Sequence, residues 1–381
     1  MVRRGLLRGG DGMLESRLHR GTTFWRMFLI WIGTLIFAGI TLVLASVAWG
    51  LVALLRGRPR RYWSRVLWAQ LLWLPFGSFV VVPLGLAWFA TRLAHTRSDE
   101  AGYRGPRIEA DGSWRLQQRG GFVHEGLVPP VFIPTADGLT LRAFLVPPRG
   151  ERTRPTALLA HGLFRGALEI EPVGAMFRDL GCEVLLLELR SHGGSSKALL
   201  GLGLHEAADV VAAVHWLRAR PGRADEAVLL YGVSLGAAAV AHAAARIPRL
   251  AGVVLDAPMD DALSTARRML NLPAKEGRRR LWIAEPWRSS VLLGVEIFAG
   301  IELAKVNPAV ALQALAPEVP VLVIGGGDDQ RMPPEVVRQV FERLPTRPER
   351  KRLWIRPGSD HGSVFVDDPQ GYREHLQWLL R

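Results

Sequence analysis

The chain has 381 residues and a mass of 42.1 kDa, which is enough for one large domain or for about two or three average ones. Hydrophobic residues make up 49% and charged residues 22%, a composition that excludes a disordered or low-complexity chain. The single cysteine, Cys182, excludes an intrachain disulfide framework and any multi-cysteine zinc or iron–sulfur site.

The net charge of +13 is concentrated at the N-terminus. Residues 1–119 hold 17 arginines and 6 acidic residues, a net +11, whereas residues 120–381 hold 31 basic and 29 acidic residues, a net +2. Arginines beside apolar segments are typical of chains that meet anionic lipid head groups. The main part of the chain therefore lacks the basic excess of a nucleic-acid-binding domain, and no nucleic-acid partner is expected.

Two long uncharged stretches follow a basic tail, residues 1–26. They run from Met27 to Leu55 and from Val66 to Thr91, and each exceeds the roughly 20 apolar residues that span a bilayer. Seven of the 13 tryptophans lie in or beside them, as an interfacial belt requires. A cleaved signal peptide fits poorly, because its apolar core has about 7–15 residues, and a buried helical hairpin is the other alternative. We predict two transmembrane helices over residues 27–91, a multi-pass membrane location and contact with membrane lipids.

The arginines leave the orientation of these two helices open. The connector, residues 56–65, holds five arginines and no acid, which favours the inner side of the membrane for it. The tail holds six, and Arg92, Arg97, Arg104 and Arg107 follow the second stretch. Both ends of the pair must share a side, so the two groups of arginines favour opposite orientations. Residues 92–122, rich in glycine and charge without apolar periodicity, are interpreted as a linker.

From residue 123 the pattern changes to short apolar runs that alternate with helical stretches. Val131–Pro148 predicts two strands around an Asp137-Gly138 turn. Helices are predicted over Glu206–Arg218 and Ala237–Arg246. Strands that alternate with helices indicate an α/β domain, with a mostly parallel sheet covered by helices on both faces. The runs that predict buried strands are TALLA before His161, EVLLLEL from Glu183, AVLLY from Ala227, GVVLD from Gly252, PVLVIG from Pro320 and RLWIR from Arg352.

The motif with the clearest chemistry is Gly232–Gly236, with the sequence GVSLG. It follows the strand AVLLY and opens the Ala-rich helix, the layout of a nucleophile elbow with Ser234 on the tight turn. Glycines two residues before and after the serine relieve backbone crowding there. GxSxG alone is a weak signal in a chain with 40 glycines, and the flanking strand and helix supply the support.

A serine hydroxyl needs a base to take its proton and an acid to orient that base. His361 follows the strand RLWIR and is the predicted base. Asp329 follows PVLVIG and is the predicted acid, with its neighbour Asp328 nearly equal and Asp256 a weaker alternative. The histidines at 205, 215 and 242 are expected to be surface or packing residues.

The oxyanion that forms during acyl transfer requires two N–H donors. The backbone amide after the nucleophile, that of Leu235, is one predicted donor. The other is the amide of Leu163, in the loop His161–Gly166 that follows the strand TALLA. His161 itself is expected to order this loop rather than transfer protons.

On these motifs, residues 130–381 resemble the α/β-hydrolase superfamily, particularly its esterase, lipase and serine aminopeptidase-like branches. Members usually read His-Gly-x-x-Asp-x-x-x-Pro around the acid, so the spacing to Pro333 selects Asp329, although Gly325 stands where that histidine is common. Ser191 likewise replaces the first glycine of the usual Arg-Gly-His-Gly-x-Ser loop. The matching pieces are AHGLFRG, LELRSHGGSS, YGVSLGAAAV, VVLDAP, NPAVALQALAPEVPVLVIGGGDDQRMPP and GSDHGSVF.

The resemblance implies covalent acyl transfer at Ser234 with no metal or organic cofactor. It also implies a cap over residues 258–310, which shapes a pocket for a small-molecule or lipid-like ester. Alternatives on the same residues are a serine aminopeptidase-like activity, acyl transfer to another acceptor, and a non-catalytic membrane scaffold. The cap's apolar residues are expected to pack on the sheet, or else to line an acyl pocket or touch the bilayer near Arg278–Arg280. These apolar residues are Trp282, Ile283, Trp287, Leu292, Leu293, Val295, Ile297 and Phe298.

Overall fold

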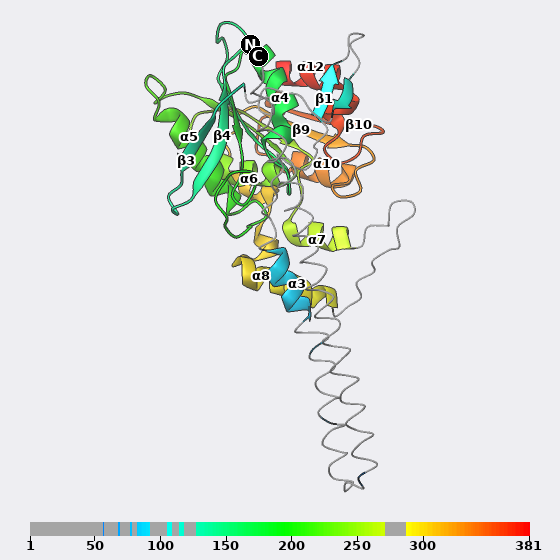
Figure 1. The fold of residues 1–381 in the computed structure, drawn as a ribbon. Helices are drawn as coiled ribbons and strands as arrows, with labels where there is room; N and C mark the ends of the chain where they lie inside the picture. Colours follow the sequence, from blue (N-terminus) through cyan, green and yellow to red (C-terminus); the bar gives the residue numbers. More distant parts are fainter. Residues whose placement is uncertain are drawn as a thin grey trace, which may run out of the picture. The chain divides into compact units, whose positions relative to one another are not determined.

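A computed structural model describes residues 82–91, 105–108, 114–117, 127–270 and 287–381, together with Arg56, Trp68 and Gly77. Its centre is an eight-stranded sheet in the order β10-β9-β8-β7-β5-β6-β4-β3 (Figure 1). All neighbours pair in parallel except β3 with β4 and β4 with β6. The strands are β3 (Pro130–Pro134), β4 (Thr140–Val146), β5 (Thr156–Ala160), β6 (Val184–Leu187), β7 (Val228–Val233), β8 (Leu250–Asp256), β9 (Val321–Gly326) and β10 (Lys351–Arg356).

Every predicted strand is present, and the prediction of a mostly parallel sheet between two helical layers is confirmed. Side chains on alternate positions of the central strands enter two separate apolar cores. Both faces of the sheet are therefore buried, which is why its strands read as continuous apolar runs. The first core holds α5 (Glu206–Arg218), α6 (Leu235–Ala244) and α10 (Pro334–Glu342), and the second holds α4 (Ala167–Asp179), α11 (Val364–Asp367) and α12 (Pro369–Leu379).

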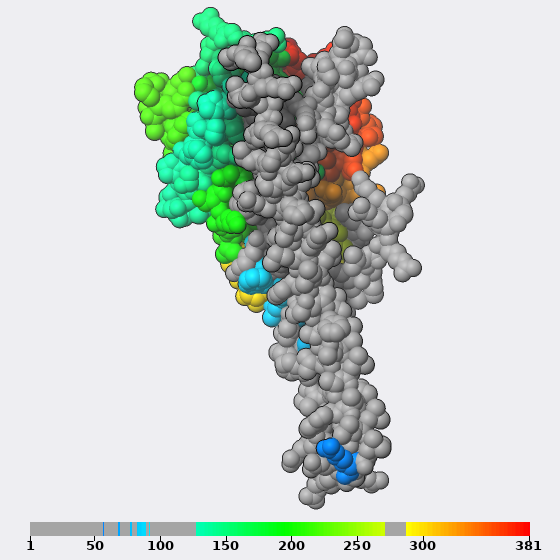
Figure 2. Space-filling view, viewed as in Figure 1, coloured from blue at the N-terminus to red at the C-terminus, as the bar shows by residue number. Residues whose placement is uncertain are grey.

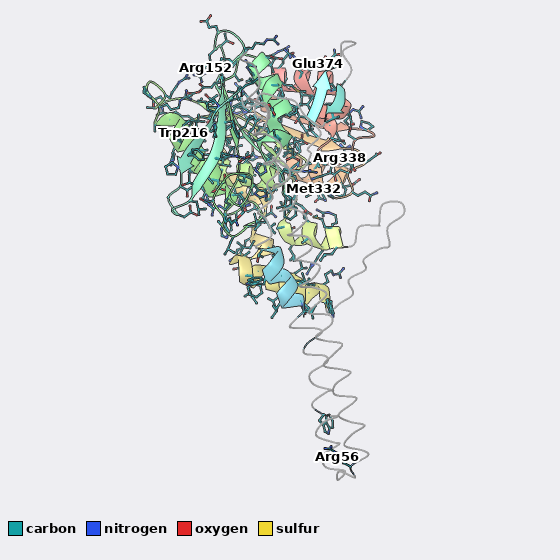
Figure 3. All side chains as sticks on the ribbon, viewed as in Figure 1. Arg56, Arg152, Trp216, Met332, Arg338 and Glu374 are labelled. Carbon is teal, nitrogen blue, oxygen red and sulfur yellow. The ribbon has the colours of Figure 1, made fainter. Side chains whose placement is uncertain are left out.

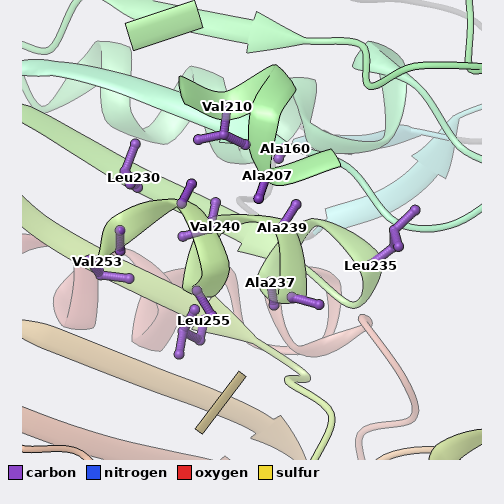
Figure 4. Packing of buried hydrophobic residues seen from close by; sticks show 14 of the residues in the cluster. Ala160, Ala207, Val210, Leu230, Leu235, Ala237, Ala239, Val240, Val253 and Leu255 are labelled. Carbon is purple, nitrogen blue, oxygen red and sulfur yellow. The ribbon is translucent and has the colours of Figure 1, made fainter. Parts of the chain in front are cut away.

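Helix α6 is the element that fixes the end of β7 in place. All ten of its residues are buried, and its alanines allow the helix axis to lie close to the strands. Figure 4 shows Ala237, Ala239 and Val240 of α6 packed among side chains of the sheet, including Leu230 and Leu255. Because the interior is closely packed around α6, the turn between β7 and α6 is held rigidly.

The two predicted transmembrane helices fall almost entirely outside the described residues. Among the described helices, none combines the length and the hydropathy that a bilayer-spanning segment needs. The end of the second uncharged stretch is described, and it forms α3 (Val82–Ala90).

The range 92–122, interpreted from the sequence as a linker, contains regular structure. β1 (Gly105–Ile108) and β2 (Trp114–Gln117) form an antiparallel two-stranded ribbon. An Asp111-Gly112 pair stands between the two strands in the sequence, and Asp-Gly between short strands is a hairpin signal. The linker interpretation missed this signal because both strands are only four residues long and the first, GPRI, has no alternation of apolar and polar residues.

Helical elements lie between β8 and β9, in the interval where the cap was predicted. They are α7 (Ala262–Leu270), α8 (Trp287–Ala299), a short helix η2 (Leu303–Lys305), α9 (Pro308–Ala311) and a second short helix η3 (Leu312–Ala314). The predicted cap residues Trp282 and Ile283 and the arginines 278–280 lie outside the described residues. In α8, Leu292 and Ala299 are buried in the first core, whereas Leu293 and Ile297 are exposed. Packing on the domain thus accounts for only one side of α8.

Candidate active site

Ser234 sits on a strained turn between β7 and α6. Its φ is +54° and its ψ is −112°, values that a residue with a side chain adopts only when the surrounding structure enforces them. The turn is tight because Gly236 lies against the end of β5: a Cβ there would be 2.2 Å from the carbonyl oxygen of Ala160. The amide of Ser234 donates to the carbonyl of Asp256 at 2.9 Å. These contacts project the serine at the carboxyl edge of the sheet.

Three side chains predicted from separate parts of the sequence form one hydrogen-bonded chain. The Oγ of Ser234 is 2.9 Å from Nε2 of His361, and Nδ1 of His361 is 2.7 Å from Oδ2 of Asp329. These residues follow three different strands, β7, β10 and β9, so the topology of the parallel sheet brings them together. The Asp329 side chain is fully buried and that of His361 is 11% exposed.

The structure distinguishes Asp329 from the two alternative acids. The Oδ1 of Asp329 accepts the amides of Arg331 and Met332 at 2.8 and 2.9 Å, which leaves Oδ2 directed at the histidine. Asp328 is exposed to solvent. Asp256 is buried, but its Oδ2 accepts the hydroxyl of Tyr372 at 2.7 Å, and burial raises the pKa of Asp256 to about 6. Only Asp329 both bonds His361 and is itself held in place.

The loop after β5 presents the amide of Leu163 between two amides that are already bonded. The N–H of Gly162 donates to Oε2 of Glu169 at 2.6 Å, and the N–H of Phe164 donates to Nε2 of His192 at 3.1 Å. Within residues 127–270 and 287–381, neither Leu163 nor Leu235 donates a backbone hydrogen bond. Leu235 is the first residue of α6, where an N–H has no acceptor in its own helix. Both predicted donors are thus available to a ligand.

Two buried histidines hold this loop in place. His161 accepts the amide of Leu189 at Nε2 and lies 2.8 Å from the Gly162 carbonyl at Nδ1, so the proton is on Nδ1. His192 has the same arrangement, with Nδ1 against the carbonyl of Arg190 and Nε2 toward Phe164. Burial and the nearby His192 ring lower the pKa of His161 well below its usual value. His161 is therefore neutral and orders the loop, as the sequence analysis expected.

The two departures from the family pattern have structural counterparts. Ser191 has a φ of +61°, which explains why glycine is usual at that position. Its hydroxyl donates to the carbonyl of Ala198 at 2.5 Å and accepts the amide of the same residue at 2.7 Å. A Cβ on Gly325 would be 3.1 Å from the methyl groups of Val337 in α10, so the Val337 side chain packs directly against the position where the family usually has a histidine.

The histidines at 205, 215 and 242 form no hydrogen bond with Ser234, His361 or Asp329 in the described part of the chain. His215 is exposed, and Nε2 of His205 is 3.0 Å from the carbonyl of Ala299 at the end of α8. His242 is largely buried in α6, and burial lowers its pKa to about 4. The described residues also contain no cluster of three or more side chains suited to holding a metal ion.

The sequence analysis did not single out Glu169, which lies directly behind the oxyanion loop. It sits in the first turn of α4, accepts the Gly162 amide and pairs with Arg165 at 3.4 Å, while 18% of its side chain is exposed. Burial raises the pKa of Glu169 to about 7, against the opposing effects of the Gly162 amide and of the charges on Arg165 and His361. The only signal in the sequence is an acid seven residues after the His-Gly pair.

Glu169→Gln is expected to change how stability depends on pH. The folded protein binds the Glu169 proton more tightly than the unfolded chain does, so wild-type stability falls as the pH rises from the unfolded pKa of 4.5 towards 7. Glutamine cannot ionise, so the stability of the variant relative to wild type should rise between about pH 5 and about pH 8, by at most about 3 kcal/mol. Thermal unfolding of both proteins between about pH 5 and about pH 8 measures this difference in stability.

The matched control is Glu374→Gln, which alters an exposed carboxylate on α12 (Figure 3). It should shift the unfolding temperature by a small amount that does not depend on pH. Equal pH dependence in both variants would contradict the assignment to Glu169.

The sequence of this domain also matches a known protein family. The family model described as "Alpha/beta hydrolase family" matches residues 157–375. This range covers the central strands, the elbow of Ser234, Asp329 and His361, and the chain belongs to this family.

Individual relatives are more distant. The uncharacterized protein YqkD of Bacillus subtilis is 25% identical over 253 residues, which is 65% of this chain and 77% of YqkD. The solved structure of the Pyrococcus furiosus esterase Pf2001 is similar with a TM-score of 0.54 and 20% identity, over 73% of this chain and 97% of that one. DcsB, solved with its substrate analogue, has a TM-score of 0.51 and 19% identity, over 67% of this chain and 99% of its own. At these identities the solved structures establish a common fold.

Proposed function

We propose that this chain is a serine hydrolase that cleaves carboxylic esters through an acyl-enzyme intermediate. The observation that carries the proposal is the hydrogen-bond chain from Asp329 through His361 to the hydroxyl of Ser234. A serine at a strained elbow, next to a histidine whose other nitrogen bonds a buried carboxylate, is the arrangement that activates a hydroxyl for acyl transfer.

In the acylation step, Ser234 Oγ attacks the ester carbonyl while His361 Nε2 takes the serine proton. Asp329 stabilises the imidazolium that forms and keeps Nε2 directed at the serine. The tetrahedral intermediate collapses when the C–O bond to the alcohol breaks, and His361 returns the proton to the leaving oxygen. Water then attacks the acyl group with His361 as the base, which releases the acid and restores Ser234.

The negative oxygen of the tetrahedral intermediate would accept the amides of Leu163 and Leu235. This role is supported by the bonded amides on either side of Leu163 and by the position of Leu235 at the N-terminus of α6. Such preorganised donors stabilise charge that develops in the transition state and cost no reorganisation during the reaction.

The sequence supports a proposal for the substrate class and the location. The uncharged stretches 27–55 and 66–91 support a membrane anchor of two helices. A hydrolase held at a bilayer, with apolar residues in its cap, favours an ester with a lipid-like acyl group. We therefore propose a membrane-anchored esterase that uses neither a metal nor an organic cofactor.

Mass spectrometry of the full chain after treatment with a fluorophosphonate tests the catalytic proposal. We expect one covalent adduct per chain, on the peptide that contains Ser234, and none on the other serine-bearing peptides of the same digest. Ser234→Ala should abolish the adduct, and treatment of wild type should abolish p-nitrophenyl ester cleavage in parallel. A folded wild-type protein that forms no adduct and cleaves no ester would overturn the proposal.

A further inference from the structure

Helix α8 of the cap packs tightly against α3, the end of the second uncharged stretch. A Cβ on Gly294 would be 2.6 Å from Cβ of Ala87 and 3.1 Å from a methyl group of Leu84. Ala87 is fully buried. A glycine at the crossing point lets the two helix backbones approach closely, and Figure 2 shows the surfaces of α3 and α8 adjoining.

Both helices of this pair expose large apolar side chains. Leu293 and Ile297 of α8 are 56% and 60% exposed, and because they are four residues apart they share one face of the helix. On α3, Val82 and Leu86 are 44% and 37% exposed and, four residues apart, also share a face, whereas Trp88, 43% exposed, lies on another side of the helix. An exposed group of large apolar side chains on neighbouring elements is typical of an interaction surface.

Charge is nearly absent from the pair. α3 contains no charged residue, and α8 contains only Arg288 and Glu296. The carboxylate of Glu296 is bound by the amide of Leu303 at 2.8 Å, inside the cap. Arginine side chains near a helix end can extend to the head groups while their stems stay in apolar surroundings. The surface of the pair is therefore compatible with hydrocarbon.

The α3–α8 pair is connected through a loop to the edge of the sheet where Ser234, His361 and Asp329 lie. The carbonyl of Ala299, the last residue of α8, is 3.0 Å from Nε2 of His205. In the loop that precedes His205, a Cβ on Gly203 would be 2.5 Å from Cβ of Ala238 in α6, the helix that begins after Ser234. α8 is thus one loop away from the helix that positions the nucleophile.

We propose that the α3–α8 pair is the surface on which the hydrolase domain rests in a lipid bilayer, and that the substrate is an ester lipid that reaches Ser234 from the bilayer. The occupant is a bilayer because α3 is the last part of Val66–Thr91, a stretch of 26 residues without charge. A chain that enters hydrocarbon through this stretch must leave it at α3, which places α8 at the same depth. The substrate assignment rests on the proposed function.

Cys182 is the only cysteine and is buried, so single probes can be placed on the full chain in a Cys182→Ser background. Leu293→Cys and Ile297→Cys receive a nitrobenzoxadiazole probe, and the control is Arg338→Cys on the exposed face of α10 (Figure 3). Each protein is reconstituted in phosphatidylcholine vesicles with or without a nitroxide on the upper acyl chain. A helix at the interface lies about 5–10 Å deep, so the probes at 293 and 297 should lose roughly half of their fluorescence while the probe at 338 keeps its own.

Activity measurements on the same vesicles test the substrate class. The double variant Leu293→Asp and Ile297→Asp should lower hydrolysis of a vesicle-embedded ester by about tenfold, because charges are costly at this depth. Cleavage of a water-soluble short-chain ester should remain unchanged, as should both activities in Arg338→Asp.

The results separate the two proposals. Fluorophosphonate adducts at Ser234 without quenching at 293 and 297 would overturn the bilayer surface and leave the hydrolase proposal intact. Equal quenching at all three positions would also overturn it, because it would indicate non-specific adsorption. Quenching without an adduct would keep the docking surface and remove the ester-lipid substrate together with the proposed function.

Discussion

Asp329→Asn is expected to lower kcat for ester hydrolysis by about 10⁴-fold, with little change in folding. The carboxylate is fully buried, and its two oxygens have separate tasks: Oδ1 accepts the amides of Arg331 and Met332, and Oδ2 accepts Nδ1–H of His361. An asparagine keeps the shape but can turn its NH₂ group toward His361. The imidazole would then hold its proton on Nε2 and could not accept the proton of Ser234.

Asp328→Asn is the matched control, because it changes an adjacent carboxylate that is exposed. It should leave kcat within about twofold of wild type, since surface substitutions far from special contacts have small effects. Steady-state kinetics of the two variants decides which aspartate is the acid. Thermal unfolding confirms that both variants are folded. If Asp328→Asn caused the larger loss, the assignment of the acid would be wrong.

Gly236→Ala is expected to destabilise the domain by at least about 3 kcal/mol. The new Cβ would lie 2.2 Å from the carbonyl oxygen of Ala160, 2.6 Å from its carbon and 2.8 Å from the carbonyl oxygen of His161. These are backbone atoms at the end of a buried strand, so the helix itself would have to move. The effect opposes helix propensity, which favours alanine over glycine by about 1 kcal/mol.

The control for this prediction is Gly252→Ala, which changes a glycine in the strand β8. Its Cβ would contact only side-chain carbons of Leu379, at 3.3–3.4 Å, and a leucine side chain can shift. At about 2–4 °C per kcal/mol for a domain of this size, Gly236→Ala should lower the unfolding temperature by about 6 °C or more, and Gly252→Ala by much less. Similar unfolding temperatures for the two variants would show that the elbow tolerates a methyl group.

The sequence was sufficient for the parts of the fold that depend on local pattern. Buried parallel strands read as apolar runs, and α5 spans the predicted residues Glu206–Arg218. The three triad positions were predictable because each follows a strand, and the carboxyl ends of parallel strands share one edge. α6 begins two residues earlier than predicted, because its first turn belongs to the elbow of Ser234.

The elements that were not predicted depend on tertiary contacts. α4 contains Pro172 in its interior, so local propensity argues against a helix there. The helix forms because Ile170, Val173 and Phe177 enter the second core. The position of Glu169 behind the oxyanion loop depends in turn on α4. Similarly, the division of α8 into a buried and an exposed side could not be predicted, because it depends on contacts with the first core and with α3.

The ends of the sheet bear on how copies of this chain behave when crowded together. Open edges of a sheet can pair with another molecule and start an aggregate. β3 has a proline at each end, Pro130 and Pro134, and neither can donate a backbone hydrogen bond to an incoming strand. β10 carries Lys351, Arg352 and Arg356, whose like charges repel the same strand of a second copy. In the described part of the chain, the domain is therefore protected against edge-to-edge association at both margins of its sheet.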